Sequence, residues 1–107
     1  MNSPDIEDTR HVVERIHKCR AFFLEDITVI EQFGAQTVWQ GVVHVFKVEG
    51  HLKTDKCYAW SSPIEGSKKR RYYTVLKIPP IDSPQKAVRA AIAYDYKKIG
   101  GGLNEKK

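Results

Sequence analysis

The sequence predicts a single α+β domain in the order α-β-β-β-α, with a three-stranded antiparallel meander and both helices packed on one face of the sheet. β-branched and aromatic residues concentrate between Thr37 and Ile78, in the stretches TVWQGVVHVFKV, KCYAWS and RYYTVLKI. Apolar residues at helical spacing lie before and after them. A chain of 107 residues fits one domain, which we expect to span residues 1–99, with residues 100–107 as a flexible tail.

The first helix is expected to begin at Ser3-Pro4, because serine caps free N–H groups and proline is tolerated in the first turn. Apolar residues then recur at steps of three and four: Val12, Ile16, Cys19, Phe23, Ile27 and Ile30. We therefore predict a helix to Leu24, then a short helix or continuation to Phe33 that Gly34 ends. The β-branched sequence ITVI within this stretch leaves a strand as the alternative.

The first predicted strand does not alternate cleanly. Its apolar residues fall on both parities: Val38, Val42, Phe46 and Val48 on one, Trp39, Val43 and Val45 on the other. Either a bulge at Gly41 shifts the register, or both faces of the strand are covered, one by the helices and one by a partner. The second explanation predicts an oligomer.

The last helix follows a proline break. Pro79-Pro80 ends the third strand, because neither proline can donate to a β-ladder. Ser83-Pro84 then repeats the opening signature of the first helix. We expect the glycines at 100–102 to end this helix.

The predicted order resembles the double-stranded-RNA-binding domain, which has the same α-β-β-β-α succession. The segment SPQKAVRAAIA is similar to the final helix of that family in its serine start and its alanines: Ser83, Ala87, Ala90 and Ala91. In that family, a pair of lysines after the serine binds RNA; in this chain the same two positions are Pro84 and Gln85. The resemblance therefore carries no functional residue over to this chain.

Charge is unevenly distributed along the chain. Residues 1–52 carry 5 Lys/Arg and 8 Asp/Glu, whereas residues 53–107 carry 13 and 5. The run GSKKRRYY at 66–73 sets four consecutive cations before two tyrosines, a combination that can bind phosphates and stack a base. The candidate nucleic-acid-binding residues are Lys68, Lys69, Arg70, Arg71, Tyr73, Lys86 and Arg89.

A second candidate surface is apolar. If the helices cover one face of the sheet, the other face is open to a protein partner or a second copy of the chain. Its candidate interface residues are Val43, Val45, Trp60 and Tyr73.

No catalytic, cofactor or metal motif is found. His44, His51, Asp55 and Cys57 lie close together in the sequence, but their spacing matches no established zinc site. A Cys57–His44–Asp55 arrangement can be drawn without any sequence feature that brings the three within reach. We therefore predict no enzyme activity, no cofactor, no metal and no small-molecule substrate.

The opening MNSPDIEDTR lacks the basic and apolar regions of a secretory signal, and no apolar run approaches membrane length. We therefore expect a cytoplasmic protein that does not interact with a membrane. The leading hypothesis is a small binding module that contacts a protein partner or forms a homodimer through an open sheet face. The alternative is nucleic-acid binding through the basic hairpin.

Overall fold

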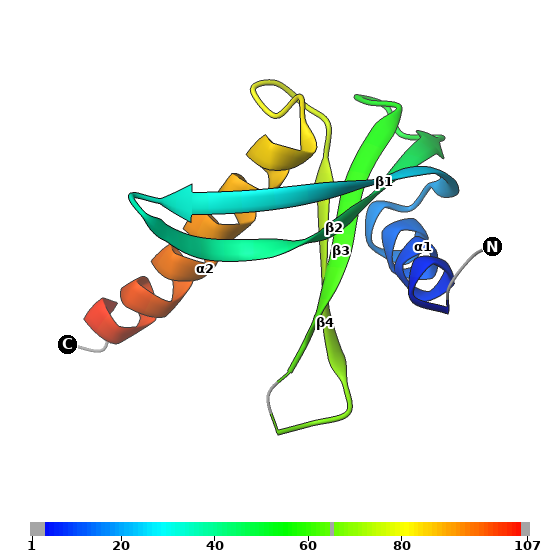
Figure 1. Ribbon diagram of the computed structural model, residues 1–107. Helices are drawn as coiled ribbons and strands as arrows, with labels where there is room; N and C mark the ends of the chain where they lie inside the picture. The colour runs from blue at the N-terminus through cyan, green and yellow to red at the C-terminus, as the bar shows by residue number, and fades with distance from the viewer. Residues whose placement is uncertain (1–3, 65, 106–107) are drawn as a thin grey trace.

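The fold is known from a computed structural model that describes residues 4–64 and 66–105. Its elements are α1 (Pro4–His17), β1 (Arg20–Phe33), β2 (Gln36–Glu49), β3 (Lys56–Pro63), β4 (Arg70–Leu76) and α2 (Pro84–Glu105). The strands form one antiparallel sheet in the order β1-β2-β3-β4 (Figure 1). The predicted α+β class is confirmed, but the sheet has four strands instead of the predicted three.

The additional strand is β1, in the stretch for which a helix was the preferred interpretation. Helix α1 ends at His17, and the next residue, Lys18, has a left-handed φ of 56°. Strand β1 then pairs with β2 from Arg20↔Glu49 onward. The preference for helix was wrong, because pairing along a whole neighbouring strand outweighs a helical spacing of apolar residues. The fourth strand also departs from the α-β-β-β-α order on which the resemblance rested.

Gly34 lies in the loop that joins β1 to β2. Phe33 pairs with Gln36, so Gly34 and Ala35 form a two-residue hairpin loop. Gly34 has a φ of 64°, which glycine adopts without steric cost at the first position of such a loop. The glycine that we expected to end a helix therefore reverses the chain between two strands.

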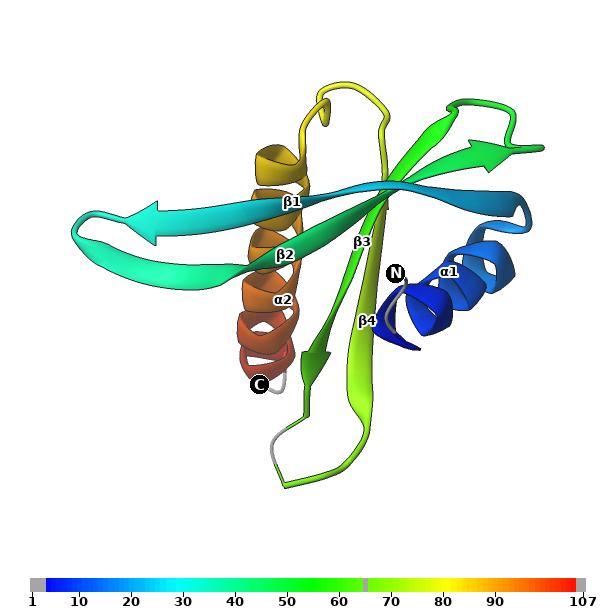
Figure 2. The same cartoon turned by 45° about the vertical axis from the view of Figure 1, so that its right-hand side comes forward.

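The two helices cover opposite faces of the sheet, as the alternation of side chains along β3 shows. Cys57 and Ala59 lie in a buried cluster with Ile6 and Val13 of α1. Tyr58 and Trp60 alternate with these two residues along the strand. They lie in a second cluster with Ala87 and Val88 of α2. Because successive strand residues face opposite ways, each helix covers its own face. In Figures 1 and 2 the β3–β4 hairpin passes between the helices. The prediction that both helices pack on one face was wrong.

Strand β2 has the mixed pattern that this arrangement requires. Phe46 and Val48 belong to the α1 cluster, and Val43 and Val45 to the α2 cluster. Both faces are therefore covered, as one of the two explanations proposed. The second cover is helix α2, however, and not a partner chain. The register shifts of the β1–β2 pair lie between Phe23 and Glu25 and between Glu31 and Gln32, away from Gly41.

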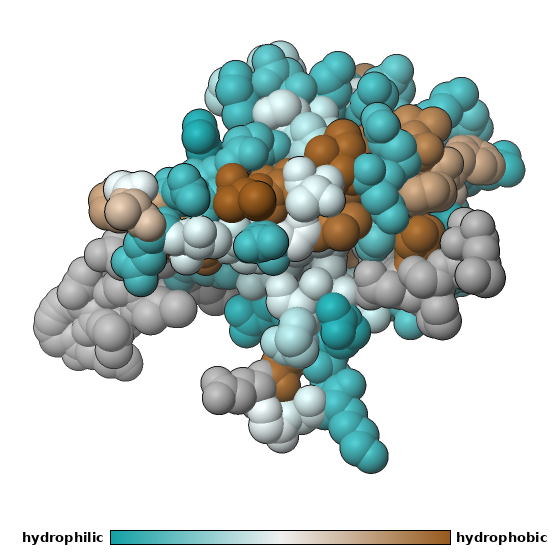
Figure 3. Space-filling view, viewed as in Figure 1, coloured by the Kyte–Doolittle hydropathy of each residue, from teal (hydrophilic) through white to brown (hydrophobic). Residues whose placement is uncertain are grey.

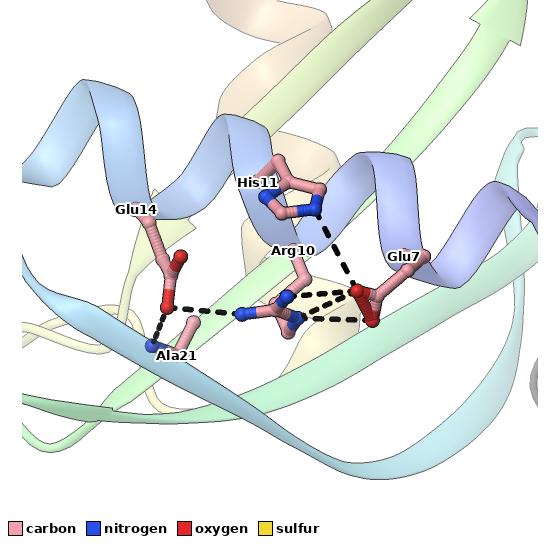
Figure 4. Close-up of polar contacts among 5 residues, drawn as sticks. All are labelled: Glu7, Arg10, His11, Glu14 and Ala21. Carbon is pink, nitrogen blue, oxygen red and sulfur yellow. Dashed lines mark hydrogen bonds and ion pairs between the residues drawn. The ribbon is translucent and has the colours of Figure 1, made fainter.

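Helix α1 is tied to the start of β1 by polar contacts, which Figure 4 shows. Arg10 forms ion pairs with Glu7 at 2.7 Å and with Glu14 at 3.1 Å. Glu14 also accepts a hydrogen bond at 2.9 Å from the backbone N–H of Ala21. One carboxylate thus joins the last turns of α1 to the first residues of the edge strand.

Helix α2 begins where the sequence predicts. The Ser83 hydroxyl accepts a hydrogen bond from the N–H of Lys86 at 3.2 Å, as expected for a serine cap. The helix then continues through the glycines at 100–102 to Glu105. The prediction that these glycines end it was wrong.

The Trp39 side chain requires a glycine two residues further along its strand. A Cβ atom on Gly41 would lie 2.9 Å from the Trp39 ring, too close for an ordinary contact. Trp39 in turn packs edge-on against Trp60, with their ring centroids 5.8 Å apart. Gly41 therefore fixes the position of one of the two tryptophans beneath α2.

We expect Gly41→Val to lower the free energy of unfolding by about 1–3 kcal/mol, because the added side chain displaces the Trp39 ring. The control is Gln40→Val, which adds a β-branched residue at the neighbouring exposed position. Urea unfolding monitored by tryptophan fluorescence measures both variants. Equal stability of the two variants contradicts this role of Gly41.

Candidate functional site

The four candidate interface residues do not lie on an open face. Val43, Val45 and Trp60 are buried in the cluster beneath α2, with Trp60 only 2% exposed. Tyr73 stacks on Trp60 with a centroid distance of 5.3 Å and donates a hydrogen bond from its hydroxyl to Asp95 at 2.7 Å. The prediction that these residues form an open contact surface was wrong, because α2 covers Val43, Val45 and Trp60.

The basic run lies in the hairpin that joins β3 to β4. Lys68, Lys69, Arg70 and Arg71 are all exposed there, and Figure 1 shows the tip of this hairpin projecting away from both helices. The Arg70 side chain donates a hydrogen bond to the Ser61 hydroxyl at 2.8 Å, which joins the two strands across the hairpin. The structure therefore presents the four consecutive cations on a projecting hairpin.

Two other members of the predicted nucleic-acid patch, Lys86 and Arg89, lie elsewhere. Lys86 pairs with Asp82 at 3.1 Å. Arg89 pairs with Glu31 of β1 at 2.8 Å. Both cations are near the start of α2, which lies at the opposite end of the molecule from the basic hairpin (Figure 1). Tyr73 lies beside Arg71, but its ring is stacked on Trp60 and is not available to a base. The predicted seven-residue patch is thus reduced to its four hairpin cations.

A histidine–carboxylate pair crosses strands β1 and β2. His44 Nδ1 lies 2.5 Å from Asp26 Oδ1, the contact that orients an imidazole in acid–base sites. The His44 side chain is only 7% exposed, packed beside Phe23 and Phe46. With so little surface available to a substrate, we interpret the pair as a structural contact that satisfies a buried polar side chain.

Cys57 does not resemble a reactive thiol. It is fully buried on the α1 face of the sheet, and burial raises its pKa to about 12, with the neighbouring Cys19 adding to the effect. The thiolate, which is the nucleophile and metal ligand, is therefore strongly disfavoured at neutral pH. Among residues 4–64 and 66–105, no three His, Cys, Asp or Glu side chains gather into a possible metal site.

Several of the exposed large apolar side chains lie on the β1–β2 hairpin. The β2–β3 pairing runs from His44 to Lys47, so residues 28–42 extend beyond β3; we call this segment the hairpin arm. Figure 3 shows apolar surface, in brown, along β1. The exposed large apolar residues of the arm are Ile30, Phe33, Val38 and Val42.

A groove lies between the tip of the arm and α2. Its volume is about 540 Å³, and it is lined by Glu31, Gln32, Phe33, Val38, Arg89, Ile92 and Ala93. Glu31 holds the arm against the helix, since it accepts hydrogen bonds from Arg89 and Gln85. Phe33 stands at the rim and is 80% exposed.

Sequence reasoning missed this surface because it placed residues up to Phe33 in a helix. Two signals were present: the β-branched run before Phe33, and a glycine directly after it. Together they indicate a strand followed by a tight turn. That interpretation puts Phe33 at a hairpin tip.

Comparisons with protein-family models, with curated proteins and with solved structures found no match to this chain. In the described part of the chain, no helix has both the length and the apolar character needed to cross a membrane.

The two thiols, one buried and one partly buried, predict a loss of stability in alkali. The pKa of Cys57 and that of Cys19 are both raised above their ordinary value of 9.0, mainly by burial. The protonated thiols therefore contribute stability in full below pH 9, and this contribution is lost as the pH rises from 9 toward about 12.

We expect the free energy of unfolding to fall between pH 8 and pH 10.5 less steeply in Cys57→Ala than in the unsubstituted chain, as measured by urea unfolding at several pH values. Some slope remains in the variant, because burial also raises the pKa of Tyr58 and of Tyr73. An unchanged slope in Cys57→Ala contradicts the assignment.

Proposed function

We propose that this chain is a small cytoplasmic protein-binding module without catalytic activity, and that it self-associates through the hairpin arm. The proposal keeps the partner class and location that the sequence predicts. It moves the contact surface from the open sheet face, which α2 covers, to the arm.

The observation that carries the proposal is the exposure of Phe33 beside an apolar groove. An 80% exposed phenylalanine leaves most of its ring in water, where burial of an aromatic ring is worth about 2–3 kcal/mol. The groove next to it is walled by Val38, Ile92 and Ala93. Exposed aromatic side chains beside an apolar groove are typical of protein-binding surfaces.

A second copy of the chain is the partner that fits this surface best. A two-fold interface uses the same patch on both copies, so each must offer both a projecting group and a recess. Phe33 and the groove that it borders meet this requirement. The charges nearest the groove, Glu31 and Arg89, are already paired with each other. Two such patches can therefore approach without bringing unpaired like charges together.

We expect the unsubstituted chain to show a concentration-dependent mass in analytical ultracentrifugation and Phe33→Asp to remain a monomer, because the substitution places a charge where the apolar contact forms. Phe33 is exposed, so the variant should keep its fold.

The matched control is Leu52→Asp, which introduces the same charge at a fully exposed leucine in the loop between β2 and β3. This variant should associate as the unsubstituted chain does. A monomer at all concentrations for the unsubstituted chain, or equal association of Phe33→Asp, contradicts the proposal.

Nucleic-acid binding is the second candidate, and the projecting basic hairpin favours it. Lys68 to Arg71 place four cations on a tip that can reach a phosphate backbone. We expect any such binding to weaken steeply with salt and to be lost in the variant Lys68→Glu/Lys69→Glu, whereas Lys86→Glu should retain it. Fluorescence anisotropy with a labelled duplex measures this. Equal binding by both variants contradicts a role for the hairpin.

A further inference from the structure

The groove between β4 and α2, together with the outer edge of β4, has the features of a peptide-binding site. We propose that it docks an extended segment of a partner protein, with acidic residues at one end and a small apolar side chain near the middle. This site lies on the opposite edge of the sheet from β1, so it is separate from the self-association surface.

The first feature is the direction of the β4 backbone groups. The N–H of Lys77 donates to Lys56 of the neighbouring chain segment at 2.9 Å, and the N–H of Ile64 donates to Lys69 at 3.2 Å. Residues that exchange hydrogen bonds alternate along an antiparallel pair. The odd-numbered β4 residues therefore bond to β3, and the even-numbered ones direct their N–H and C=O groups outward.

Two of these outward-facing residues, Tyr72 and Thr74, lie in the middle of β4. Strand β4 is at the end of the sheet order in the part of the chain that the structure describes. An edge of this kind is a template for an added strand. Addition of an extended peptide to such an edge uses main-chain hydrogen bonds for affinity and side-chain pockets for specificity.

The second feature is a groove of about 420 Å³ beside this edge. It is lined by Arg71, Tyr72, Tyr73, Thr74, Val75, Ala90, Ala91, Tyr94 and Asp95. The small side chains of Ala90 and Ala91 keep the helix wall low, which leaves room for the side chains of an added strand. A strand edge facing a helix across a groove is the geometry in which an extended peptide can be held on two sides.

The third feature is a smaller cavity of about 100 Å³ that shares Tyr73, Ala91 and Asp95 with the groove. Its further wall includes Trp39 and Trp60. Tyr73, whose hydroxyl is bonded to Asp95, belongs to the wall that the cavity and the groove share. Because successive residues of an added strand point alternately toward and away from α2, one inward side chain meets this wall. The aromatic ring of Tyr73 and the short side chain of Ala91 favour a small apolar side chain there.

Charge gives the peptide its direction. Arg71 lines the groove at the hairpin end, and Lys68 and Lys69 continue the positive charge beyond it. Asp95 is the acidic residue in the lining, and it already accepts the Tyr73 hydroxyl hydrogen bond. The hairpin end of the site is therefore net positive, and it selects a segment with acidic residues at that end.

The test begins with a random octapeptide display library selected on the immobilised full chain. We expect enriched sequences with Asp or Glu at one end and a small apolar residue near the middle. A synthetic enriched peptide should shift the amide NMR signals of β4 and of residues 90–95. Methylation of alternate peptide N–H groups should abolish binding, because it removes the main-chain hydrogen bonds.

Two variants and their matched controls locate the site. Arg71→Glu and Ala90→Phe should each weaken the enriched peptide about tenfold or more, by removing the positive end or by filling the groove. Lys53→Glu makes the same charge change in a distant loop, and Ala93→Phe makes the same size change on the wall of the other groove. Both controls should bind normally. Because Arg71 is exposed, Arg71→Glu should keep its fold, and it tests the site even if Ala90→Phe does not fold.

The proposal is overturned if no sequence is enriched over the Arg71→Glu chain, or if enriched peptides bind with signal shifts confined to the hairpin arm. It is also overturned if N-methylated peptides bind as well as unmodified ones. Because Phe33→Asp should leave peptide binding intact, failure of self-association and failure of this site are distinguishable.

Discussion

Strand β3 is buried on both of its faces, and the rest of the molecule is arranged around that constraint. Cys57 and Ala59 contact one cluster, and Tyr58 and Trp60 contact the other. A strand with two covered faces needs a helix on each side. A domain of this size contains few helices and strands. Each of the two helices therefore covers a different face of the sheet, and neither face is covered completely.

The surfaces proposed for binding all lie where the two helices leave part of the sheet or a hairpin uncovered. The hairpin arm extends past β3, so the face that α2 does not cover there exposes Ile30 and Val42. The β3–β4 hairpin projects between the helices and carries the basic run. The outer edge of β4 has no further strand among the described residues, and α2 forms the other wall of its groove. Positions near the periphery of a rigid sheet are where loops and edges can take up partners without disturbing the core.

The sequence predicted the elements whose local signals agree with their tertiary surroundings. The Ser83 cap and the strands in the stretches TVWQGVVHVFKV and KCYAWS all appear in the structure as expected. The prediction failed where the same residues fit two structures: residues 20–30 carry apolar side chains at helical spacing, yet they pair with β2 and form a strand. The surface assignment failed for a related reason. Hydrophobicity identifies Val43 and Trp60 as contact residues, but it cannot tell whether the contact is a partner or the chain's own second helix.

Amide hydrogen exchange measured by NMR tests the central claim most directly, because protection reports how far each strand must open before its N–H groups reach water. If β3 joins two clusters, the amides of residues 57–60 should be among the slowest to exchange. They should open only with global unfolding, whereas residues 34–38 at the tip of the arm should exchange much faster. Amides of residues 57–60 that exchange as fast as those of the arm would contradict a β3 strand covered on both faces.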